Sequence, residues 1–506
     1  MSRDYSYLLH VAAAKYPDRT VLAYKDQRWT FRDFDIATDR LSAAFERLGL
    51  TGRNVVTLLE NEPATVMTYL ALARAGAINV PVNPRLLSEE VGFVLQDCGA
   101  SAIIADDAFS ATVAELLAKH DGVDRLVTVN APRCEPPGER LEDLLEGPDH
   151  RPGTVVDPAS VASIIYTSGT SGFPKGVERS HEANIWAAVN AALAQHRSPS
   201  DTEVFVLPLF GIAFMFQVMP MILSGGTTVL DGAFDAERIW ELIESHRATR
   251  IFLAPTMLDS MLSVAGQEQR DVSSLRILNT AYEFPERVRK GALERFGAIV
   301  AYMYGLTEAQ LCVSTPEEFA EDPSNAGHPM GVMRVGVFGA DRNPVPVGTV
   351  GEIAFEGPSI MAGYHGLPEV TSEALIDGWL YTGDLGHIDA CGRIHVVGRK
   401  KAMIKTGGLS VDPIEVENVI AEIAAIREAA VVGILDEHWG EQVVAFAVLA
   451  EGAEGSEAEI LAYTKSRLAG YKCPKRVWFL PALPRNPTGK VERGRLEAEA
   501  AGRAGI

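Results

Sequence analysis

The segment YTSGTSGFPKG, Tyr166 to Gly176, carries the pattern that decides the fold class of this chain. Its glycines let successive backbone N–H groups converge, and such a nest of donors binds anions. The hydroxyl groups and Lys175 add further donors for a phosphate chain. The apolar run VASII precedes the segment and predicts a buried strand, and SHEANIWAAVNAALAQH follows it and predicts a helix. We therefore interpret the segment as a phosphate-binding loop within an α/β unit.

Two alternatives bear on this interpretation of the loop. A Walker A loop requires Gly-Lys-Ser/Thr, but Pro174 precedes Lys175 and Gly176 follows it, so that motif is excluded. An ordinary turn rich in Gly and Ser has the same composition. Only the rest of the chain separates a turn from a phosphate site.

Composition indicates a folded chain of more than one domain. The 506 residues are too many for one ordinary core, and 47% hydrophobic with 22% charged residues is typical of a globular protein. A net charge of −21 opposes nonspecific binding to nucleic acid or to an anionic membrane. The cysteines are scattered without a CxxC pair, which argues against a zinc site or a disulfide framework and favours a reducing, cytoplasmic location. The N-terminal segment does not resemble a signal peptide, and no apolar run reaches membrane-spanning length.

Strands and helices alternate along the first half of the chain. Apolar segments such as NVVTLLE, AINVPV, SAIIADD and TEVFVLPL predict buried strands, and runs such as PATVMTYLALARAG predict the helices between them. Thr30 is predicted to cap a helix, with Asp33 as a weak version of the capping box. This alternation predicts largely parallel sheets covered by helices.

The pattern changes after about Gly351. Short segments bounded by turns, from GEIAFEG to GRIHVVG, predict a small β subdomain. The charged segment GRKKAMIKTGG is a hinge candidate, and the segments from DPIEVENVIAEI onward predict a compact α+β domain.

Three segments hold residue types that serve chemistry. AYMYGLTEAQ places Tyr304, Thr307 and Glu308 at the end of a predicted strand. LYTGDLG places Asp384 on a tight turn, and PRNPTGKVER isolates Lys490 on a Pro/Gly loop. Taken alone, each residue also has an ordinary interpretation, such as a core tyrosine, a turn aspartate or a surface lysine.

In their order along the chain, YTSGTSGFPKGV, YGLTE, YTGDLG, GRKKAMIKTGG and PRNPTGKV resemble the motifs of the adenylate-forming superfamily. This superfamily contains acyl- and aryl-CoA synthetases, stand-alone adenylation enzymes and firefly luciferase. The resemblance implies an α/β fold with a large N-terminal domain of α/β and β subdomains and a small, mobile α+β C-terminal domain. We place the AMP- and acid-binding domain at residues 1–399 and the mobile catalytic domain at residues 400–506.

The resemblance implies an AMP-forming carboxylic acid–thiol ligase that uses ATP, Mg²⁺ and coenzyme A. A carboxylate and MgATP would give an acyl-adenylate and pyrophosphate, and attack by a thiol would then give a thioester. Because the first step is an in-line displacement at phosphorus, its catalysis depends on positioning and charge stabilisation. The expected partners are a small carboxylic acid and a thiol, either CoA or the phosphopantetheine of a carrier protein.

The resemblance also assigns nucleotide-binding roles. Tyr304 would stack on adenine, Thr307 would bond the α-phosphate, and Glu308 would hold Mg²⁺, a hard cation that favours phosphate and carboxylate oxygens. Asp384 would accept the ribose hydroxyls with help from Arg399. The positions that would hold the β- and γ-phosphates are Thr167, Ser168, Gly169, Thr170, Ser171, Gly172 and Lys175.

The C-terminal residues are implied to act in turn. Lys490 would bridge the substrate carboxylate and the α-phosphate, because a compact charge can serve two oxygens. Lys401 matches the hinge of the family, at which the C-terminal domain would rotate between the two steps. The rotation would carry Lys490 away and bring Gly408, with its neighbour Gly407, to line the thiol tunnel.

Several positions depart from the family pattern. Many members have His where Gly211 stands, and the Asp of amino-acid-activating members is also missing, so an α-amino acid is not expected. The adenine-binding Gly-Gly-Ala is replaced by Thr280-Ala281-Tyr282, and Ala402 replaces the acidic residue that often follows the hinge. These changes leave open how efficient adenylation is.

The segment LPLFGIAF predicts the character of the acid. Its aromatic and aliphatic side chains make an apolar wall, and its small residues leave room for an apolar, bulky acid. The alternative is that several of the aromatic residues belong to the core. The predicted pocket residues are Phe210, Gly211, Ile212, Ala213 and Phe214.

Other functions stay open at this point. The chain could load a carrier protein, or form thioesters only from a preformed acyl-adenylate, an option that Gly211 keeps open. A noncatalytic nucleotide-binding protein is a further alternative, although binding alone requires neither Lys490 nor Glu308. The sequence identifies neither the acid nor the thiol, and it leaves open a role in secondary metabolism and a homodimer.

Overall fold

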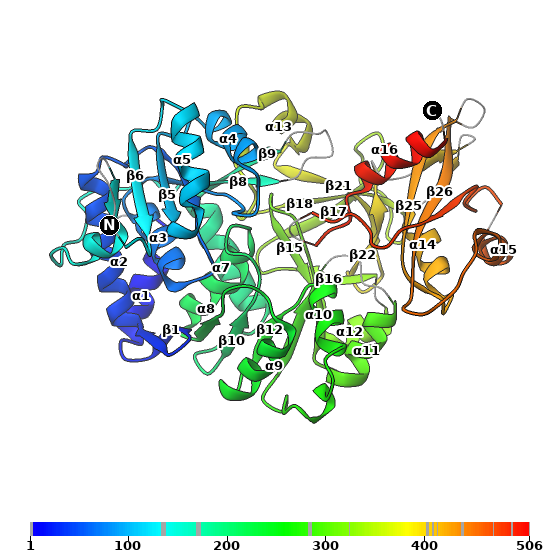
Figure 1. Cartoon of the computed structure of the whole chain (residues 1–506), viewed down its shortest axis with the longest axis horizontal. Helices are drawn as coiled ribbons and strands as arrows, with labels where there is room; N and C mark the ends of the chain where they lie inside the picture. The colour runs from blue at the N-terminus through cyan, green and yellow to red at the C-terminus, as the bar shows by residue number, and fades with distance from the viewer. Residues whose placement is uncertain are drawn as a thin grey trace.

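The computed structural model describes residues 4–132, 138–167, 174–281, 286–322, 324–400, 404–406, 409–411, 413–436, 440–468, 470–486 and 489–504. These residues form three β-sheets with helices packed on them (Figure 1). Two large sheets belong to the N-terminal part of the chain, and the third lies in the C-terminal part.

The first sheet has parallel strands with the phosphate-loop hairpin toward one edge. Strands β8, β4, β3, β5, β6 and β7 run parallel to one another, whereas β9 and β19 are antiparallel to their neighbours. The predicted strands NVVTLLE, AINVPV and SAIIADD are therefore confirmed. The strand order is β19 (Gly363–Tyr364), β9 (Lys175–Ser180), β8 (Val161–Thr167), β4 (Ile78–Pro81), β3 (Asn54–Leu58), β5 (Ala102–Asp106), β6 (Arg125–Val129) and β7 (Gly138–Arg140).

The second sheet is parallel in one half and antiparallel in the other. Strands β1, β11, β10, β12, β13 and β14 run parallel, and the strands beyond β14 pair antiparallel. The antiparallel part contains segments of the predicted β subdomain, as β18, β21 and β22, and also three strands that precede Gly351. The order is β2 (Gln27–Thr30), β1 (Thr20–Tyr24), β11 (Thr227–Leu230), β10 (Thr202–Phe205), β12 (Arg250–Phe252), β13 (Ile277–Thr280), β14 (Val300–Gly305), β15 (Gln310–Val313), β16 (Asn325–Pro329), β22 (Ile394–Arg399), β21 (Trp379–Ile388), β18 (Gly351–Glu356) and β17 (Arg334–Phe338), with β20 (Leu375–Ile376) beside β21.

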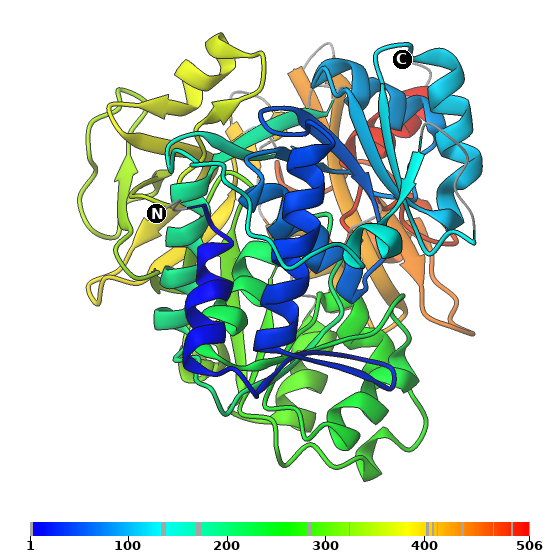
Figure 2. The ribbon, with the colours of Figure 1, turned by 90° about the vertical axis from the view of Figure 1, so that its left-hand side faces the viewer.

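Helices between the two large sheets give them a common core. Val55 of β3 and Phe205 of β10 lie in the same buried cluster as side chains of α1, α2 and α3. The predicted cap of α2 is confirmed, because the Asp33 N–H donates to Thr30 Oγ1 at 3.1 Å. Figure 2 shows the helices nearest the N-terminus, in dark blue, facing the viewer. The helices of this layer are α1 (Tyr7–Lys15), α2 (Phe31–Arg47), α3 (Pro63–Arg74), α7 (His181–Ala194) and α8 (Met219–Ser224).

The other helices of the N-terminal part pack on the outer faces of the sheets or in their connections. They are α4 (Ser88–Asp97), α5 (Ser110–Lys119), α6 (Leu141–Leu145), α9 (Ala236–Ser245), α10 (Pro255–Leu262), α11 (Glu286–Phe296), α12 (Pro316–Glu321) and α13 (Pro368–Ala374). In the part of the chain that the structure describes, no helix combines the length and the apolar character needed to cross a membrane.

The third sheet forms the C-terminal α+β part, at the right in Figure 1. Its order is β24 (Leu409–Val411), β23 (Ile404–Thr406), β26 (Gly440–Leu449) and β25 (Ile426–Asp436), with β27 (Val477–Phe479) parallel to β26. The helices of this part are α14 (Pro413–Ala421), α15 (Glu457–Arg467) and α16 (Arg493–Ala504). The predicted large N-terminal and small C-terminal parts are confirmed, while the boundary after residue 399 stays a prediction.

Candidate active site

The predicted phosphate loop lies between the two antiparallel strands β8 and β9. Thr167 and Lys175 face each other at the loop end of this hairpin, and Thr167 Oγ1 donates to the Lys175 carbonyl at 3.4 Å. The helix predicted after the loop is α7, and strand β9 lies between the loop and this helix. The other predicted loop residues, Ser168, Gly169, Thr170, Ser171 and Gly172, lie outside the described residues.

A tyrosine that the sequence did not single out connects the loop lysine with the predicted magnesium ligand. Lys175 Nζ lies 5.4 Å from the centre of the Tyr364 ring, a cation–π distance. The Tyr364 hydroxyl donates to Glu308 Oε1 at 2.7 Å. Strand β19, which carries Tyr364, pairs with β9. The structure thus brings Lys175 and Glu308 to one tyrosine, the lysine over its ring and the carboxylate at its hydroxyl.

The predicted adenine and ribose residues contact each other. The Tyr304 hydroxyl donates to Asp384 Oδ2 at 2.5 Å, and both residues are buried. Burial, followed by the charge of Asp384, raises the pKa of Tyr304 well above its ordinary value. The hydroxyl therefore keeps its proton at neutral pH and remains a donor to the carboxylate.

The position of Asp384 differs from the prediction. It lies within the long strand β21 rather than on a tight turn, and it pairs across the sheet with Arg399. Gly383 gave the local turn signal. In the structure it has a φ of +73° within strand β21, close to a register shift between Leu385 and Gly386. The side chain of Arg399 lies outside the described residues.

The remaining nucleotide positions are described in part. Thr307 follows the end of β14, and its carbonyl accepts a hydrogen bond from a buried arginine, Arg179, at 3.2 Å. Thr280 ends β13 and is fully buried, and Ala281 packs against the core. Tyr282 lies outside the described residues.

The predicted acid segment divides into exposed and buried residues. Phe210, Gly211 and Ile212 are partly exposed, whereas Ala213 and Phe214 are buried. Phe214 packs edge-on against Tyr69, with ring centres 5.3 Å apart. This packing is that of a core residue and argues against Phe214 as a pocket wall.

Space is present beside Gly211. A Cβ atom added there would have the Pro208 carbonyl oxygen, at 3.7 Å, as its nearest neighbour among the described residues. That distance is ordinary van der Waals contact, so a Cβ atom can be accommodated at this position without displacing its surroundings.

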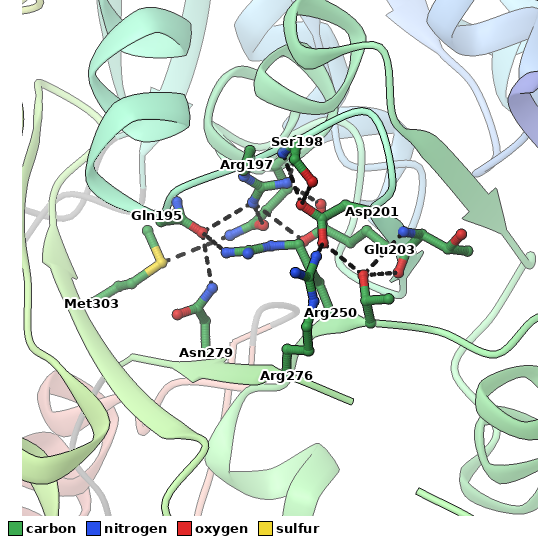
Figure 3. A network of polar contacts seen from close by, with 12 residues as sticks. Gln195, Arg197, Ser198, Asp201, Glu203, Arg250, Arg276, Asn279 and Met303 are labelled. Carbon is green, nitrogen blue, oxygen red and sulfur yellow. Dashed lines mark hydrogen bonds and ion pairs between the residues drawn. The ribbon is translucent and has the colours of Figure 1, made fainter. Parts of the chain in front are cut away.

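A buried polar network lies behind the acid segment (Figure 3). Arg197 pairs with Glu203 and donates to the Gln217 carbonyl at 3.3 Å. The Gln217 amide contacts Met303 Sδ at 3.7 Å, and Asn279 donates to Gln195 Oε1 at 2.9 Å. Gln217 belongs to the π-helical turn Phe214–Val218, Asn279 precedes Thr280, and Met303 precedes Tyr304. The network therefore joins the acid segment to two strands that carry predicted nucleotide residues.

The loop of Lys490 approaches the N-terminal part of the chain. The backbone N–H of Lys490 donates to Asn486 Oδ1 at 2.9 Å, and the Lys490 side chain is exposed. Gly489 has φ +85°, and a Cβ added to it would lie 3.3 Å from Thr256 Oγ1 of α10. Lys401, Gly407 and Gly408, the predicted hinge and tunnel residues, lie outside the described residues.

Comparisons with known proteins give matches over nearly the whole chain. Residues 9–365 match the AMP-binding enzyme family and residues 415–490 match the AMP-binding enzyme C-terminal domain. A feruloyl-CoA synthase from Amycolatopsis is 34% identical, with 95% of this chain and 96% of that protein covered.

Two further proteins match over a comparable share of this chain. An indoleacetate–CoA ligase from Aromatoleum aromaticum is 35% identical, with 94% of each chain covered. The structure of the amide bond synthetase McbA from Marinactinospora thermotolerans superposes with a TM-score of 0.89 at 27% identity, covering 98% of this chain and 99% of that one.

Proposed function

Because this chain belongs to the AMP-binding enzyme family, and thereby to the adenylate-forming superfamily, we propose that it is an acyl- or aryl-CoA ligase. It activates a carboxylic acid with ATP and transfers the acyl group to the thiol of CoA. The observation that carries this proposal is a pair of contact groups among the predicted residues. Lys175 and Glu308 both contact Tyr364, and Tyr304 bonds Asp384.

The described residues suit a nucleotide with a bound Mg²⁺ ion. Lys175 supplies a positive charge, and Glu308 supplies a carboxylate whose Oε1 is already oriented by Tyr364. Carboxylate and phosphate oxygens are the ligands that Mg²⁺ prefers. When bound, the ion would neutralise phosphate charge that develops as pyrophosphate leaves. Asp384 would accept the ribose hydroxyls, and Tyr304 holds that carboxylate in place.

The acid is proposed to be apolar and larger than acetate. Phe210 and Ile212 present partly exposed apolar surface on either side of Gly211, where a side chain is missing. Similarity to feruloyl-CoA synthase and indoleacetate–CoA ligase supports an aryl acid. Ala213 and Phe214 support this segment from the core instead of contacting the acid.

The proposal also covers the thiol acceptor, the domain boundary, the assembly and the location. CoA is the proposed thiol, and the phosphopantetheine of a carrier protein is the alternative. The domain boundary after residue 399, a homodimer and a reducing cytoplasmic location complete the proposal. The last rests on the composition of the chain, whose described cysteines are all free thiols.

One screen tests the function. The full-length protein is incubated with MgATP and a panel of acids, and pyrophosphate release is measured with and without CoA. We expect release that depends on an apolar acid and a thioester product that depends on CoA. A thioester formed only on a carrier protein would favour the alternative acceptor, and an amine acceptor belongs in the panel because of the similar amide bond synthetase. If none of the acids in a broad panel gave pyrophosphate release, the proposal would be contradicted.

Replacing Asp384 by alanine is expected to weaken ATP binding. The carboxylate is buried and bonded to Tyr304, and losing hydrogen bonds to a charged group costs about 1.5–3 kcal/mol. Calorimetry with ATP measures the loss. Tyr304→Phe is the matched control, because it removes the hydroxyl while keeping the ring and the carboxylate, and its effect should be smaller. Unchanged ATP affinity in Asp384→Ala would show that this carboxylate is structural only.

Replacing Gly211 by histidine is expected to shift acid preference toward small acids. The position has room for the Cβ atom of the new side chain and lies between the apolar residues Phe210 and Ile212, and each CH₂ that the acid can no longer bury costs about 0.8 kcal/mol. Rates on acetate, octanoate, benzoate and a polycyclic acid compare wild type with Gly211→His. Gly211→Ala, a smaller addition, should give an intermediate profile. An identical size profile in all three proteins would remove Gly211 from the acid pocket.

A further inference from the structure

One fully buried arginine lies beneath the residues assigned to magnesium and phosphate. Arg179 is on β9, four residues after Lys175, and its side chain has no solvent exposure. Neither the motifs of the sequence nor the function proposed above uses this residue.

Every N–H group of the Arg179 guanidinium has a partner. A guanidinium has five such donors in a fixed planar fork, and all of the acceptors here are neutral oxygens. They are Asn184 Oδ1 at 2.8 Å and the carbonyl oxygens of Thr307 at 3.2 Å, Glu308 at 3.2 Å, Ser359 at 3.1 Å and Ala183 at 3.5 Å.

These contacts fix the backbone on both sides of the Glu308 carboxylate. Arg179 Nη1 holds the consecutive carbonyls of Thr307 and Glu308, and the Glu308 carbonyl also accepts from the Met361 N–H at 2.7 Å. The same segment leads to Tyr364, whose hydroxyl holds the Glu308 side chain. Main chain and side chain of Glu308 are therefore held by different donors, and Arg179 shares the main-chain anchor with the Met361 N–H.

The charge of Arg179 is retained although it is buried. Burial lowers the pKa of Arg179 to about 10, and the charge of Glu308 acts in the opposite direction. The group is therefore cationic at neutral pH. No carboxylate accepts a hydrogen bond from it among the described residues, so its positive charge is not cancelled by a bonded partner.

We propose that Arg179 is a positioning residue for magnesium-bound ATP, acting through the Thr307–Glu308 backbone that it holds by hydrogen bonds. The proposal rests on the proposed function in one respect, that Glu308 contacts the metal. Removing Arg179 takes one donor from each of the carbonyls of Thr307 and Glu308, and it leaves the Glu308 carbonyl with the Met361 N–H as its remaining donor. Loss of a group that orients a metal ligand typically costs 10–100-fold in metal affinity or activity, so a loss of about that size is expected.

Calorimetry of ATP binding, in magnesium and in EDTA, tests the proposal without requiring turnover. Wild type is expected to bind ATP more tightly in magnesium than in EDTA, and the magnesium ratio is the ATP affinity in magnesium divided by that in EDTA. Arg179→Met should reduce this ratio by roughly tenfold. Arg179→Lys keeps the charge but not the planar fork, so it should give a smaller reduction. Arg74→Met is the matched control, because Arg74 is equally buried but bonds Ser6, Asp35 and Asp39 far along the chain from the site. It should lower the melting temperature and keep the magnesium ratio.

A second readout separates positioning from stability. In Arg179→Met, pyrophosphate release should fall by roughly 10–100-fold, while thioester formation from a supplied acyl-adenylate stays close to wild type. A magnesium ratio that is unchanged in both Arg179 variants, or changed as much in Arg74→Met, would overturn the proposal. If wild type shows the magnesium-dependent ATP binding but activates no acid, the proposed function fails while the role of Arg179 is still decided by the binding ratios.

Discussion

Replacing Lys490 by alanine is expected to lower pyrophosphate release by on the order of 100-fold or more, the usual loss when a group that stabilises transition-state charge is removed. The same variant should form thioester from a supplied acyl-adenylate at close to the wild-type rate, because the charge is required only while the α-phosphorus reacts. Both the PRNPTGKVER motif and the position of its loop in the structure motivate this prediction. The Lys490 loop reaches α10 of the N-terminal part, where Gly489 approaches Thr256.

A lysine elsewhere in the same domain provides the control for this prediction. Lys475 is also exposed, and its Nζ contacts only the Gly470 carbonyl, at 3.5 Å, among the described residues. Lys475→Ala should leave both half-reactions unchanged. Pyrophosphate release at the wild-type rate in Lys490→Ala would show that another group supplies the charge.

Replacing Lys401 by proline is expected to separate the two half-reactions in the opposite sense. Proline fixes φ at the position proposed to absorb the torsional change of domain rotation. Adenylation should stay near normal, whereas thioester formation should fall on the order of 100-fold, because a thiol site misplaced by about 1 Å can cost that much. Stopped-flow measurement of each half-reaction, with a supplied acyl-adenylate for the second, checks this expectation.

Lys401→Ala is the matched control for the hinge. It removes the same side chain but leaves the backbone free to rotate, so it should retain both half-reactions. Equal loss of both steps in Lys401→Pro, at unchanged melting temperature, would remove Lys401 as the hinge. Equal loss of thioester formation in both variants would assign the effect to the side chain instead of the backbone.

The sequence predicted the elements whose signals are contiguous. The strands around Val55 and Ile103 are short apolar runs, and the cap at Thr30 depends on a residue three positions away. The motifs of Tyr304, Glu308 and Lys490 are also short segments, in which the residue types themselves indicate chemistry. Such features depend on neighbours within one turn or one strand, so they can be recognised without a three-dimensional structure.

The residues that the sequence did not predict depend on distant pairing. Arg179 contacts a carbonyl 128 residues away, and Tyr364 contacts Glu308 across 56 residues. An arginine within a strand carries no local sign of such partners. The error at Asp384 has a related cause, because pairing of β21 with β22 overrode the Gly–Asp turn signal. Phe210 and Phe214 look alike in the sequence, and only packing against Tyr69 separates the core residue from the exposed one.

The buried network of Arg197 and Gln217 has a consequence for redesigning this protein to accept other acids. The Gln217 side chain accepts a hydrogen bond from Arg197 and contacts Met303. Arg197 also donates to Gln195, which accepts from Asn279, so a library that randomises Gln217 would alter the acid and nucleotide sides together. Variation confined to Phe210–Ile212 avoids these bonds. We expect such a library to yield folded variants that differ in acid preference, and libraries that include Gln217 to yield mainly variants with weakened ATP use.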